Sequence, residues 1–309
     1  MGHFLVTRFA SAAIVVFGVT SLVFFMIHLI PGDPVEVMLG ESARVADREN
    51  LRHALGLDRP LLVQWLDYLS HLMRFDLGES LHSKQPIIDI LLAHIPATLE
   101  LTLVALLFAI VIALPLGIMA ALHRNTGWDR TAMTVSLLGV SIPNFLMGPL
   151  LILLFAMYLG WLPVSGRESP DSVILPALTL GTAMAAILSR MVRATLLEVI
   201  NEDYIRTARA KGLSWFRTIL LHAMPNTMLP IITLLGLQLG ALLAGAVITE
   251  VVFSWPGIGQ LTIEAIHTRD YPLVQSCILL ISLSYVLVNI VTDILYSVLD
   301  PRVRLGETE

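Results

Sequence analysis

Long apolar runs alternate with short polar segments along this chain. A helix that crosses a membrane needs about 20 predominantly apolar residues. Six runs satisfy this, and we predict transmembrane helices at residues 9–30, 98–122, 133–159, 173–191, 229–252 and 273–298. The first run is longer than a signal-peptide core and no small-x-small cleavage pattern follows it, so we expect it to stay attached as a helix. The pattern predicts an all-α integral membrane protein.

Composition supports the membrane class. The mean hydropathy is +0.80, and 56% of the 309 residues are hydrophobic while only 14% are charged. Soluble domains carry about 25% charged residues. The single cysteine, Cys277, excludes an intrachain disulfide. The net charge of -5 says little, because orientation in a membrane depends on how Lys and Arg are divided between loops.

The distribution of cations predicts the orientation. Cationic short loops stay on the cytoplasmic side. With the N-terminus inside, the cytoplasmic segments hold eleven cations: Arg8, Arg124, Arg130, Arg190, Arg193, Arg206, Arg209, Lys211, Arg217, Arg302 and Arg304. The two short outer loops hold only Arg167 and Arg269. We therefore expect residues 1–8, 192–228 and 299–309 in the cytoplasm, and residues 31–97 and 253–272 outside.

The outer segment at residues 31–97 contains structure of its own. After Pro60, apolar residues recur at three- and four-residue spacing, namely Leu62, Trp65, Leu66, Leu69, Leu72 and Met73. This spacing predicts an amphipathic helix, whose apolar face lies on the bilayer surface, on the spans or on a partner. Residues 75–80 then form a turn.

Prolines interrupt two of the predicted spans. They are Pro115, near Gly117, in the second span, and Pro143 and Pro149 in the third. A proline removes a backbone hydrogen bond, which a membrane tolerates only where neighbouring helices or water satisfy the freed carbonyl. Ser141 and Asn144 place polar groups beside this backbone. These helices either line a translocation path or use their prolines only to shape packing.

Motifs for catalysis are missing from the sequence. It contains no Gly-x-x-x-x-Gly-Lys-[Ser/Thr] phosphate loop and no His-Glu-x-x-His motif. Gly139-Val140-Ser141 begins like a nucleophile elbow, but Ile142-Pro143 follows where a glycine is needed. The sequence therefore gives no basis for ATP hydrolysis or for an intramembrane enzyme.

Four ionisable residues lie in predicted spans, where a charge is costly and often functional. They are His28, Glu100, Glu250 and Asp293. All four lie within about two turns of a span end, so we expect them to reach water or headgroups. This placement disfavours a proton relay, and with it an ion-coupled secondary transporter.

A cationic segment at residues 203–225 separates the fourth and fifth spans. It carries Arg206, Arg209, Lys211 and Arg217. We predict that Asp203 caps a helix beginning at Tyr204 and that Gly212 ends it in the left-handed conformation. Ser214 then caps a second helix that ends near Met224, before Pro225. In the first helix Arg206, Arg209 and Ala210 share a face, with Ala208 and Lys211 beside it, and we expect this surface to meet an acidic partner.

The 203–225 segment resembles the coupling loop of permease subunits of binding-protein-dependent ABC importers. The family pattern is Glu-Ala-Ala, three residues, Gly, then Ile-x-Leu-Pro. Aligned on Gly212, its proline falls on Pro225 and its last alanine on Ala208. The chain departs from the pattern at Arg206, Thr207, His222 and Met224. The stretch from Asp203-Tyr204 to Gly212 looks like the variant of the peptide and nickel branch.

Other segments agree with that branch in the same order along the chain. They are Pro31-Gly32-Asp33-Pro34, Phe75-Asp76-Leu77-Gly78-x-Ser80, Ile95-Pro96-Ala97-Thr98-Leu99-Glu100, Ser141-Ile142-Pro143-Asn144-Phe145, Ile174-Leu175-Pro176, Phe253-x-Trp255-Pro256-Gly257-Ile258-Gly259, Arg269-Asp270-Tyr271-Pro272 and Asp300-Pro301-Arg302. The chain resembles the first, B-type permease of dipeptide, oligopeptide, glutathione or nickel systems, and this resemblance implies the type I permease fold of ABC importers.

The resemblance also implies partners and roles. It implies a non-catalytic permease in a bacterial inner membrane, paired with a second permease, two ATPase subunits and an outer solute-binding protein. ATP and magnesium are expected on the ATPases, with no cofactor or metal in this chain. The implied coupling residues are Asp203, Tyr204, Arg206, Ala208, Arg209, Ala210, Lys211, Gly212 and Pro225. The implied path or outer-gate residues are Ser141, Pro143, Asn144, Trp255, Pro256, Gly257 and Gly259.

Residues 253–271 are expected to form an outer re-entrant turn that meets the binding protein or the substrate. Di- or oligopeptides are the favoured cargo because no His, Met or Cys cluster marks a metal path; Met26, His28 and Cys277 are scattered. Nickel and glutathione importers remain alternatives within the branch. A secondary transporter or channel, and more remotely an intramembrane enzyme, are the alternatives of other classes.

Overall fold

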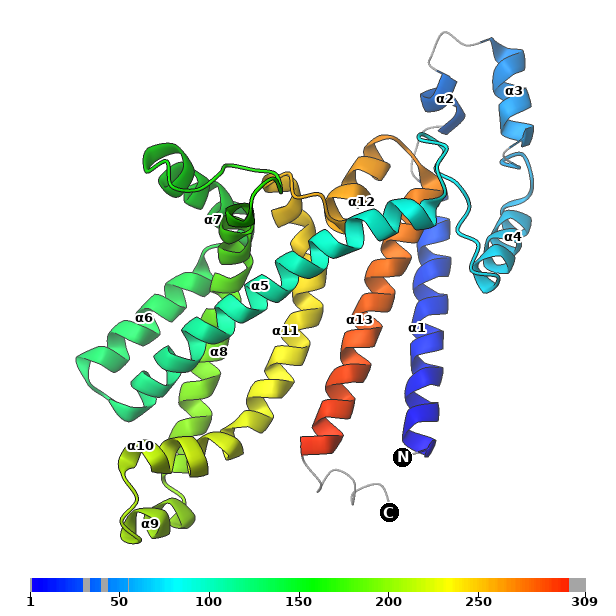
Figure 1. The fold of residues 1–309 in the computed structure, drawn as a ribbon. Coiled ribbons are helices and arrows are strands. Elements are labelled where there is room, and N and C mark those ends of the chain that lie inside the picture. The colour runs from blue at the N-terminus through cyan, green and yellow to red at the C-terminus, as the bar shows by residue number, and fades with distance from the viewer. Residues whose placement is uncertain (1, 30–33, 40–43, 55, 300–309) are drawn as a thin grey trace. The chain divides into compact units, whose positions relative to one another are not determined.

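A computed structural model describes residues 2–29, 34–39, 44–54 and 56–299 as a helical protein (Figure 1). The helices are α1 (Gly2–Leu29), α2 (Pro34–Leu39), α3 (Val45–Ala54), α4 (Leu61–Met73), α5 (Ile87–Leu122), α6 (Gly127–Ser141), α7 (Asn144–Leu151), the π-helix η1 (Ile152–Tyr158), the 3-10 helix η2 (Pro170–Val173), α8 (Ile174–Ile200), α9 (Asp203–Ala210), α10 (Trp215–Thr218), the π-helix η3 (Ile219–Ala223), α11 (Met224–Val252), α12 (Ile258–His267) and α13 (Tyr271–Leu299). In the described part of the chain, the β-pairing is one isolated bridge between Glu79 and Pro86.

The all-α membrane class is confirmed. Five helical stretches are long and apolar enough to span a membrane, namely Ala10–Leu29, Ile87–Leu122, Pro170–Ile200, Trp215–Gly240 and Tyr271–Thr292. A bent pair, Gly127–Ser141 with Asn144–Tyr158, brings the number to six if it counts as one span. The predicted motifs at Pro31, Gly32 and Asp33 and at Asp300, Pro301 and Arg302 lie outside the described residues.

The chain divides into two compact units. One comprises Met1–Thr98 with Pro256–Val286, and the other comprises Leu99–Trp255 with Leu287–Glu309. In the first unit, a buried apolar cluster joins α1, the start of α5, α12 and the start of α13, with Val23, Leu91, Leu261 and Cys277 among its members. In the second unit α8 is the central helix, since 67% of its most apolar window is buried.

The second span differs from its prediction in length and continuity. α5 begins at Ile87 rather than at residue 98, and its 36 residues extend about 54 Å, well beyond a hydrocarbon core of about 30 Å. The expected interruption at Pro115 is wrong, because α5 remains helical through that residue. Gly117 explains how the helix is supported: it lies directly against the Ser189 carbonyl and Val192 of α8, and packing on a neighbouring helix is what tolerates a proline in a span.

The third span is broken at Pro143, as expected. α6 ends at Ser141, α7 begins at Asn144, and the two directions differ by 103°. The interruption expected at Pro149 is wrong, because this residue lies inside α7. The residues after α7 form the π-helix η1 instead of a further α-helical turn. The break at Pro143 is therefore the main bend of this segment.

Helical structure also extends past the predicted ends of the 192–228 loop. α8 continues to Ile200, and the second short helix does not end near Met224. Instead α10, η3 and α11 follow one another without a gap from Trp215 to Val252. Pro225 fits because it lies in the first turn of α11, where a missing N–H costs little.

The outer segment contains the predicted amphipathic helix, since α4 covers Leu61–Met73. The turn that follows is fixed by Asp76. Its Oδ1 accepts a hydrogen bond of 3.0 Å from the Gly78 N–H, and its Oδ2 lies 3.0 Å from His71 Nδ1. These two bonds hold the pKa of Asp76 below its usual range, so the carboxylate stays ionised at neutral pH.

We predict that Gly117→Ala destabilises the protein. A Cβ at this position would lie 2.7 Å from both Ser189 O and Val192 Cβ, and such overpacking costs about 1–3 kcal/mol. The melting temperature in detergent should fall by several degrees. Gly127→Ala is the matched control, because a Cβ there meets nothing within 4 Å. Equal melting temperatures for the two variants would contradict the close approach of α5 and α8.

Candidate functional site

The 203–225 segment lies at the end of α8, where α9 and α10 follow it in the chain (Figure 1). The N-cap of α9 is Glu202, and Asp203 is the first helical residue. The prediction that Asp203 caps this helix is therefore wrong by one position. Asp203 still suits its place, because an acidic side chain in the first turn interacts favourably with the helix dipole.

The two other predicted signals of this segment are confirmed. Gly212 has a φ of +84°, a conformation that disfavours side chains with a Cβ. Its N–H donates to Arg209 O over 2.9 Å and the Leu213 N–H donates to Ala208 O over 3.4 Å, which is the hydrogen-bond pattern of a Schellman motif. Ser214 caps α10, since its Oγ accepts from the Arg217 N–H over 3.4 Å. The chain therefore turns sharply between two capped helices.

One face of α9 is anchored in the protein's own core. Ile205 is 1% exposed and Ala208 is 4% exposed. Ile205 belongs to a buried cluster with Ala121 of α5, Leu196 of α8, and Ile219 and Ala223 of η3. The expectation that Ala208 lies on a partner-facing surface is wrong, because this residue is buried within the protein. Sequence reasoning missed Ile205, although its spacing of three residues from Ala208 signals a shared helix face.

The opposite face of α9 is open to solvent. Its exposed residues are Asp203, Tyr204, Arg206, Thr207, Arg209, Ala210 and Lys211, followed by Gly212, and Pro225 is also exposed. The Arg209 guanidinium lies 4.6 Å from the centre of the Trp215 ring, a cation–π contact that holds this side chain over α10. Partial desolvation raises the pKa of Tyr204, so its hydroxyl stays neutral at pH 7. This face can dock an acidic partner through hydrogen bonds from arginine.

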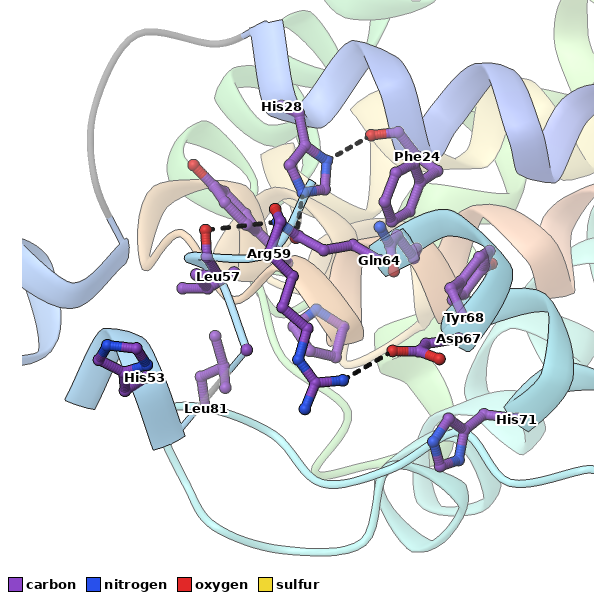
Figure 2. Close-up of a pocket in the computed structure, with 14 residues that line it drawn as sticks. Phe24, His28, His53, Leu57, Arg59, Gln64, Asp67, Tyr68, His71 and Leu81 are labelled. Carbon is purple, nitrogen blue, oxygen red and sulfur yellow. Dashed lines mark hydrogen bonds and ion pairs between the residues drawn. The ribbon is translucent and has the colours of Figure 1, made fainter. Parts of the chain in front are cut away.

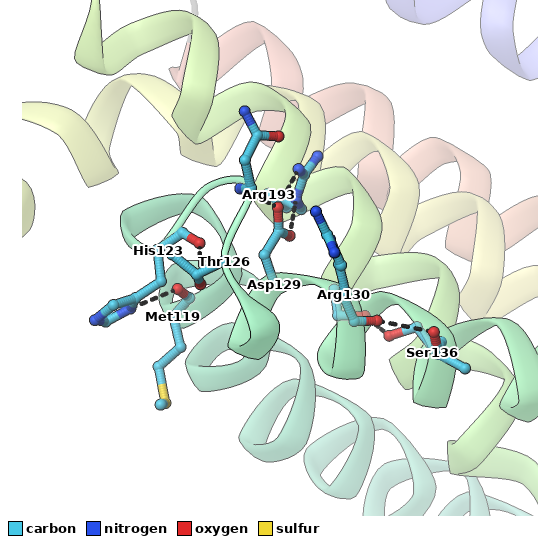
Figure 3. A network of polar contacts seen from close by, with 10 residues as sticks. Met119, His123, Thr126, Asp129, Arg130, Ser136 and Arg193 are labelled. Atoms are coloured by element: carbon cyan, nitrogen blue, oxygen red, sulfur yellow. Dashed lines mark hydrogen bonds and ion pairs between the residues drawn. The ribbon is translucent and has the colours of Figure 1, made fainter.

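An ion pair near this segment was not foreseen. Arg193, counted above as a loop cation, lies in α8 and forms two hydrogen bonds to Asp129 of α6, of 2.6 and 2.8 Å (Figure 3). The sequence offered no signal for the pairing, since the partners are 64 residues apart.

The residues proposed to line a path or outer gate divide into several places. Ser141 and Pro143 are exposed at the break between α6 and α7, with Asn144 at the start of α7. The Ser141 hydroxyl donates to Leu137 O over 2.8 Å, back into its own helix.

Trp255 is a core residue, contrary to its assignment as an outer-gate contact. Its side chain is 0% exposed, and that of Phe253 is 1% exposed. The Gly166 N–H donates to Phe253 O over 2.9 Å, and the Arg167 guanidinium lies 5.8 Å from the Trp255 ring centre. The turn at the end of α11 is thus held by the loop that precedes α8, and its aromatic rings fill space within the protein.

The remainder of the predicted re-entrant turn contains a helix, α12. Gly257 is its N-cap and is buried with Gly259, while Pro256 is exposed. The Ile258 N–H donates to Thr98 Oγ1 over 2.8 Å. Beyond α12, buried Asp270 accepts from the Ser80 hydroxyl over 2.5 Å and from the His82 N–H over 3.3 Å. These bonds give Ser80 and Asp270, which belong to two of the motifs, a structural role, because they join two distant parts of the chain.

A cavity of about 420 Å³ lies in the unit that contains α4, and Figure 2 shows its lining. Aromatic rings of Phe24, His28, Tyr68 and Tyr271 contribute to it, and Arg59 pairs with Asp67 over 3.0 Å. Burial raises the pKa of Tyr68 to about 12, so the phenol is a neutral hydrogen-bonding group. Both charged and aromatic side chains therefore line this cavity.

The intramembrane ionisable residues have different surroundings. His28 Nδ1 lies 2.7 Å from Phe24 O and Nε2 lies 3.3 Å from Gln64 Oε1. Glu100 pairs with Arg167 over 2.6 Å. Glu250 is 0% exposed, so the expectation that it reaches water is wrong; the chain itself encloses it. The side chain of Asp293 lies outside the described residues.

Among the residues that the structure describes there is no group of three or more His, Cys, Asp and Glu placed to hold a metal.

Two family profiles match the chain. Residues 113–305 match the binding-protein-dependent transport system inner membrane component, and residues 1–102 match the N-terminal part of the binding-protein-dependent transport system membrane component. The first match includes the 203–225 segment and the α6–α7 break.

Close relatives align over nearly the full length. The chain is 48% identical to the di/tripeptide transport system permease protein DppB of Pseudomonas aeruginosa (strain UCBPP-PA14), with 93% of this chain and 94% of that protein covered. It is 42% identical to the glutathione transport system permease protein GsiC of Escherichia coli O6:H1, covering 98% and 99%.

Solved structures share the fold at low sequence identity. An inward-facing structure of the MetNI methionine ABC transporter has a chain that matches with a TM-score of 0.60 and 20% identity, covering 70% of this chain and 99% of that one. The crystal structure of an amino acid ABC transporter with histidines matches with a TM-score of 0.55 and 15% identity, covering 68% and 94%.

We predict that Ile205→Ala loosens α9. Removing a buried isoleucine side chain costs about 2–5 kcal/mol, and the loss falls on a helix of only eight residues. Trypsin should then cleave at Arg206, Arg209 and Lys211 several times faster in membrane vesicles opened on the side of this segment. Phe216→Ala, which truncates a side chain that is 73% exposed, is the control and should leave the rate unchanged. Similar rates for all three proteins would show that Ile205 is not the anchor.

Proposed function

Because this chain belongs to the family of binding-protein-dependent transport system inner membrane components, and is a permease of the peptide-type ABC importers, we propose how it works within its complex. It pairs with a second permease to form the translocation path. Two ATPase subunits bind on the cytoplasmic side, and a solute-binding protein delivers di- or oligopeptides from outside. ATP and magnesium bind to the ATPases.

The observation that carries this proposal is that α9 has one side buried in the protein and the other side exposed. Ile205 packs in the buried cluster that α5, α8 and η3 form and Ala208 is also buried, while Arg206, Arg209 and Lys211 remain exposed. A loop that is cationic only because of membrane orientation does not need such an anchor. A helix that transmits force needs both a rigid inner face and an accessible outer face. We therefore assign Asp203, Tyr204, Arg206, Arg209, Ala210, Lys211 and Gly212 to ATPase docking, with Ala208 as an anchor and Pro225 at the start of α11.

The transmission follows from binding thermodynamics. A docked helix shifts a conformational equilibrium only through contacts that differ between the open and closed ATPase pair. Closure of the ATPases on ATP would displace α9, and the buried cluster would pass that displacement to α8 and α5. The translocation path between the two permeases then changes from inward-facing to outward-facing, and peptide is released into it from the binding protein.

Two cargo classes are consistent with the relatives. One relative is named for di- and tripeptides at 48% identity, and another for glutathione at 42% identity. Glutathione is itself a small peptide, so the same path chemistry serves both. The solute-binding protein filters the cargo in such systems, and identifying the ligand bound to that partner would decide between them.

The proposed topology places the chain in a bacterial inner membrane with both termini, and the 203–225 segment, in the cytoplasm. The cation distribution supports this orientation, because Arg206, Arg209 and Lys211 are retained on the side that holds the ATPases.

A direct test is the composition and energy source of the complex. Purification of the tagged chain from native membranes should recover an ATPase pair and a second permease, and peptide uptake in proteoliposomes should be sensitive to vanadate. Uptake that runs on an ion gradient, with no ATPase recovered, would favour the secondary transporter instead.

We also predict that Gly212→Val uncouples transport. Gly212 has a φ of +84°, and a Cβ at this position would meet nothing within 4 Å, so a β-branched residue strains the Schellman turn without a steric clash. Membrane insertion should persist, while uptake and the stimulation of ATP hydrolysis by loaded binding protein fall at least about tenfold, within the usual range of coupling energies.

The control for that experiment is Gly160→Val. Gly160 has a φ of +63° and equally open surroundings, but it lies in the loop after η1, away from the 203–225 segment in the chain. Its variant should transport normally. Normal transport by Gly212→Val would remove the coupling assignment.

A further inference from the structure

Helix α6 is fastened to α8 along their length. At one end, Arg193 Nε donates to Asp129 Oδ1 over 2.6 Å and Nη2 donates to Oδ2 over 2.8 Å. Further along, the Ser136 and Ser189 hydroxyls are 2.8 Å apart and buried. Near the other end of α6, Gly139 lies close to Ala186 of α8. Along this series the residue numbers rise in α6 and fall in α8, so the two helices are antiparallel and in contact.

The ion pair is the most restrictive of these contacts. The Asp129 side chain is 6% exposed and that of Arg193 is 25% exposed. Two parallel hydrogen bonds between a guanidinium and a carboxylate fix orientation as well as distance. Asp129 Oδ2 also accepts from the Asn125 N–H over 2.9 Å, which ties the turn between α5 and α6 to the same carboxylate.

The pair lies beside the anchor of the 203–225 segment. Leu196, three residues after Arg193 in α8, is fully buried in the cluster that holds Ile205. At its far end α6 leads to the break at Pro143, where the chain bends by 103°. A continuous series of contacts thus joins α9 to α8, α8 to α6, and α6 to the bend.

We propose that the Asp129–Arg193 ion pair is a positioning contact that makes α6 move together with the 203–225 segment, so that displacement of α9 reaches the bend at Pro143. This inference rests on the proposed coupling function. Apolar contact alone would permit α8 to slide along α6, whereas the two-pronged bond holds one register. The pair acts through the helices and does not touch the cargo.

The test uses a variant that removes the pair without leaving a buried charge. In the double variant D129N/R193M, the new amide oxygen still accepts from the Asn125 N–H, and replacing both charges of a buried pair is often neutral for stability. The purified complex in proteoliposomes should assemble and hydrolyse ATP, but peptide uptake per ATP should fall about tenfold. The swapped pair Asp129→Arg with Arg193→Asp should restore part of the loss.

Arg130→Met is the matched control. Arg130 is exposed and adjacent to Asp129 in α6, so this variant removes a charge from the same helix but leaves the pair intact. It should transport like the wild type. If the wild-type complex shows no ATP-dependent uptake, the proposed function fails; if the wild type transports and D129N/R193M transports equally per ATP, only the ion-pair inference fails.

A distance measurement separates movement from stability. Spin labels at Trp128→Cys, where the native residue is 68% exposed, and at Asn201→Cys, the C-cap of α8, report α6 relative to the end of α8, where the 203–225 segment begins; the native Cys277 is buried. In the wild-type background the distance should be the same without nucleotide and after trapping with ATP and vanadate. In D129N/R193M it should change between the two states. A change in the wild type, or none in the variant, would overturn the proposal.

Discussion

The burial of Ile205 and Ala208 is the interaction on which the account depends. A helix of eight residues has little stability of its own in water, and α9 keeps its place because Ile205 enters the core formed by α5, α8 and η3 and Ala208 is buried as well. Its cations are exposed as a consequence of that anchoring. Without the apolar contacts the same residues would be a flexible basic loop, able to attract a partner but unable to transmit its movement.

The surrounding structure is arranged to make that anchor rigid. Gly212 ends α9 in a Schellman turn, Ser214 starts α10, and Arg209 stacks on Trp215. Pro225 then enters a helix at a position where its missing N–H costs little. These local features connect the 203–225 segment to the long helices α8 and α11, so under the proposed coupling a displacement of the segment would reach both helices.

Much of this could be predicted from the sequence because its signals are local. Apolar run length indicated the spans, i to i+4 spacing predicted α4, and the glycine at 212 and serine at 214 predicted both helix boundaries. Apart from local errors such as the N-cap of α9, the wrong predictions concern tertiary packing. Pro115 does not break α5, because α8 packs against α5 at Gly117. Trp255 is buried in the protein interior and is not part of a gate. Asp129 pairs with Arg193, which lies 64 residues away in the sequence. No periodicity along the chain records such distant contacts.

The central claim is that the exposed face of α9 touches an ATPase subunit. Single cysteines at Ala210 on this face and at Pro163 in the loop after η1 test it most directly, because the native Cys277 is buried. After labelling of these cysteines in the intact complex with a short reagent that carries one thiol-reactive and one photoreactive group, followed by irradiation, the account predicts a crosslinked product containing the ATPase from Ala210→Cys and none from Pro163→Cys. Failure of Ala210→Cys to crosslink with an ATPase in a complex that transports peptide would contradict it.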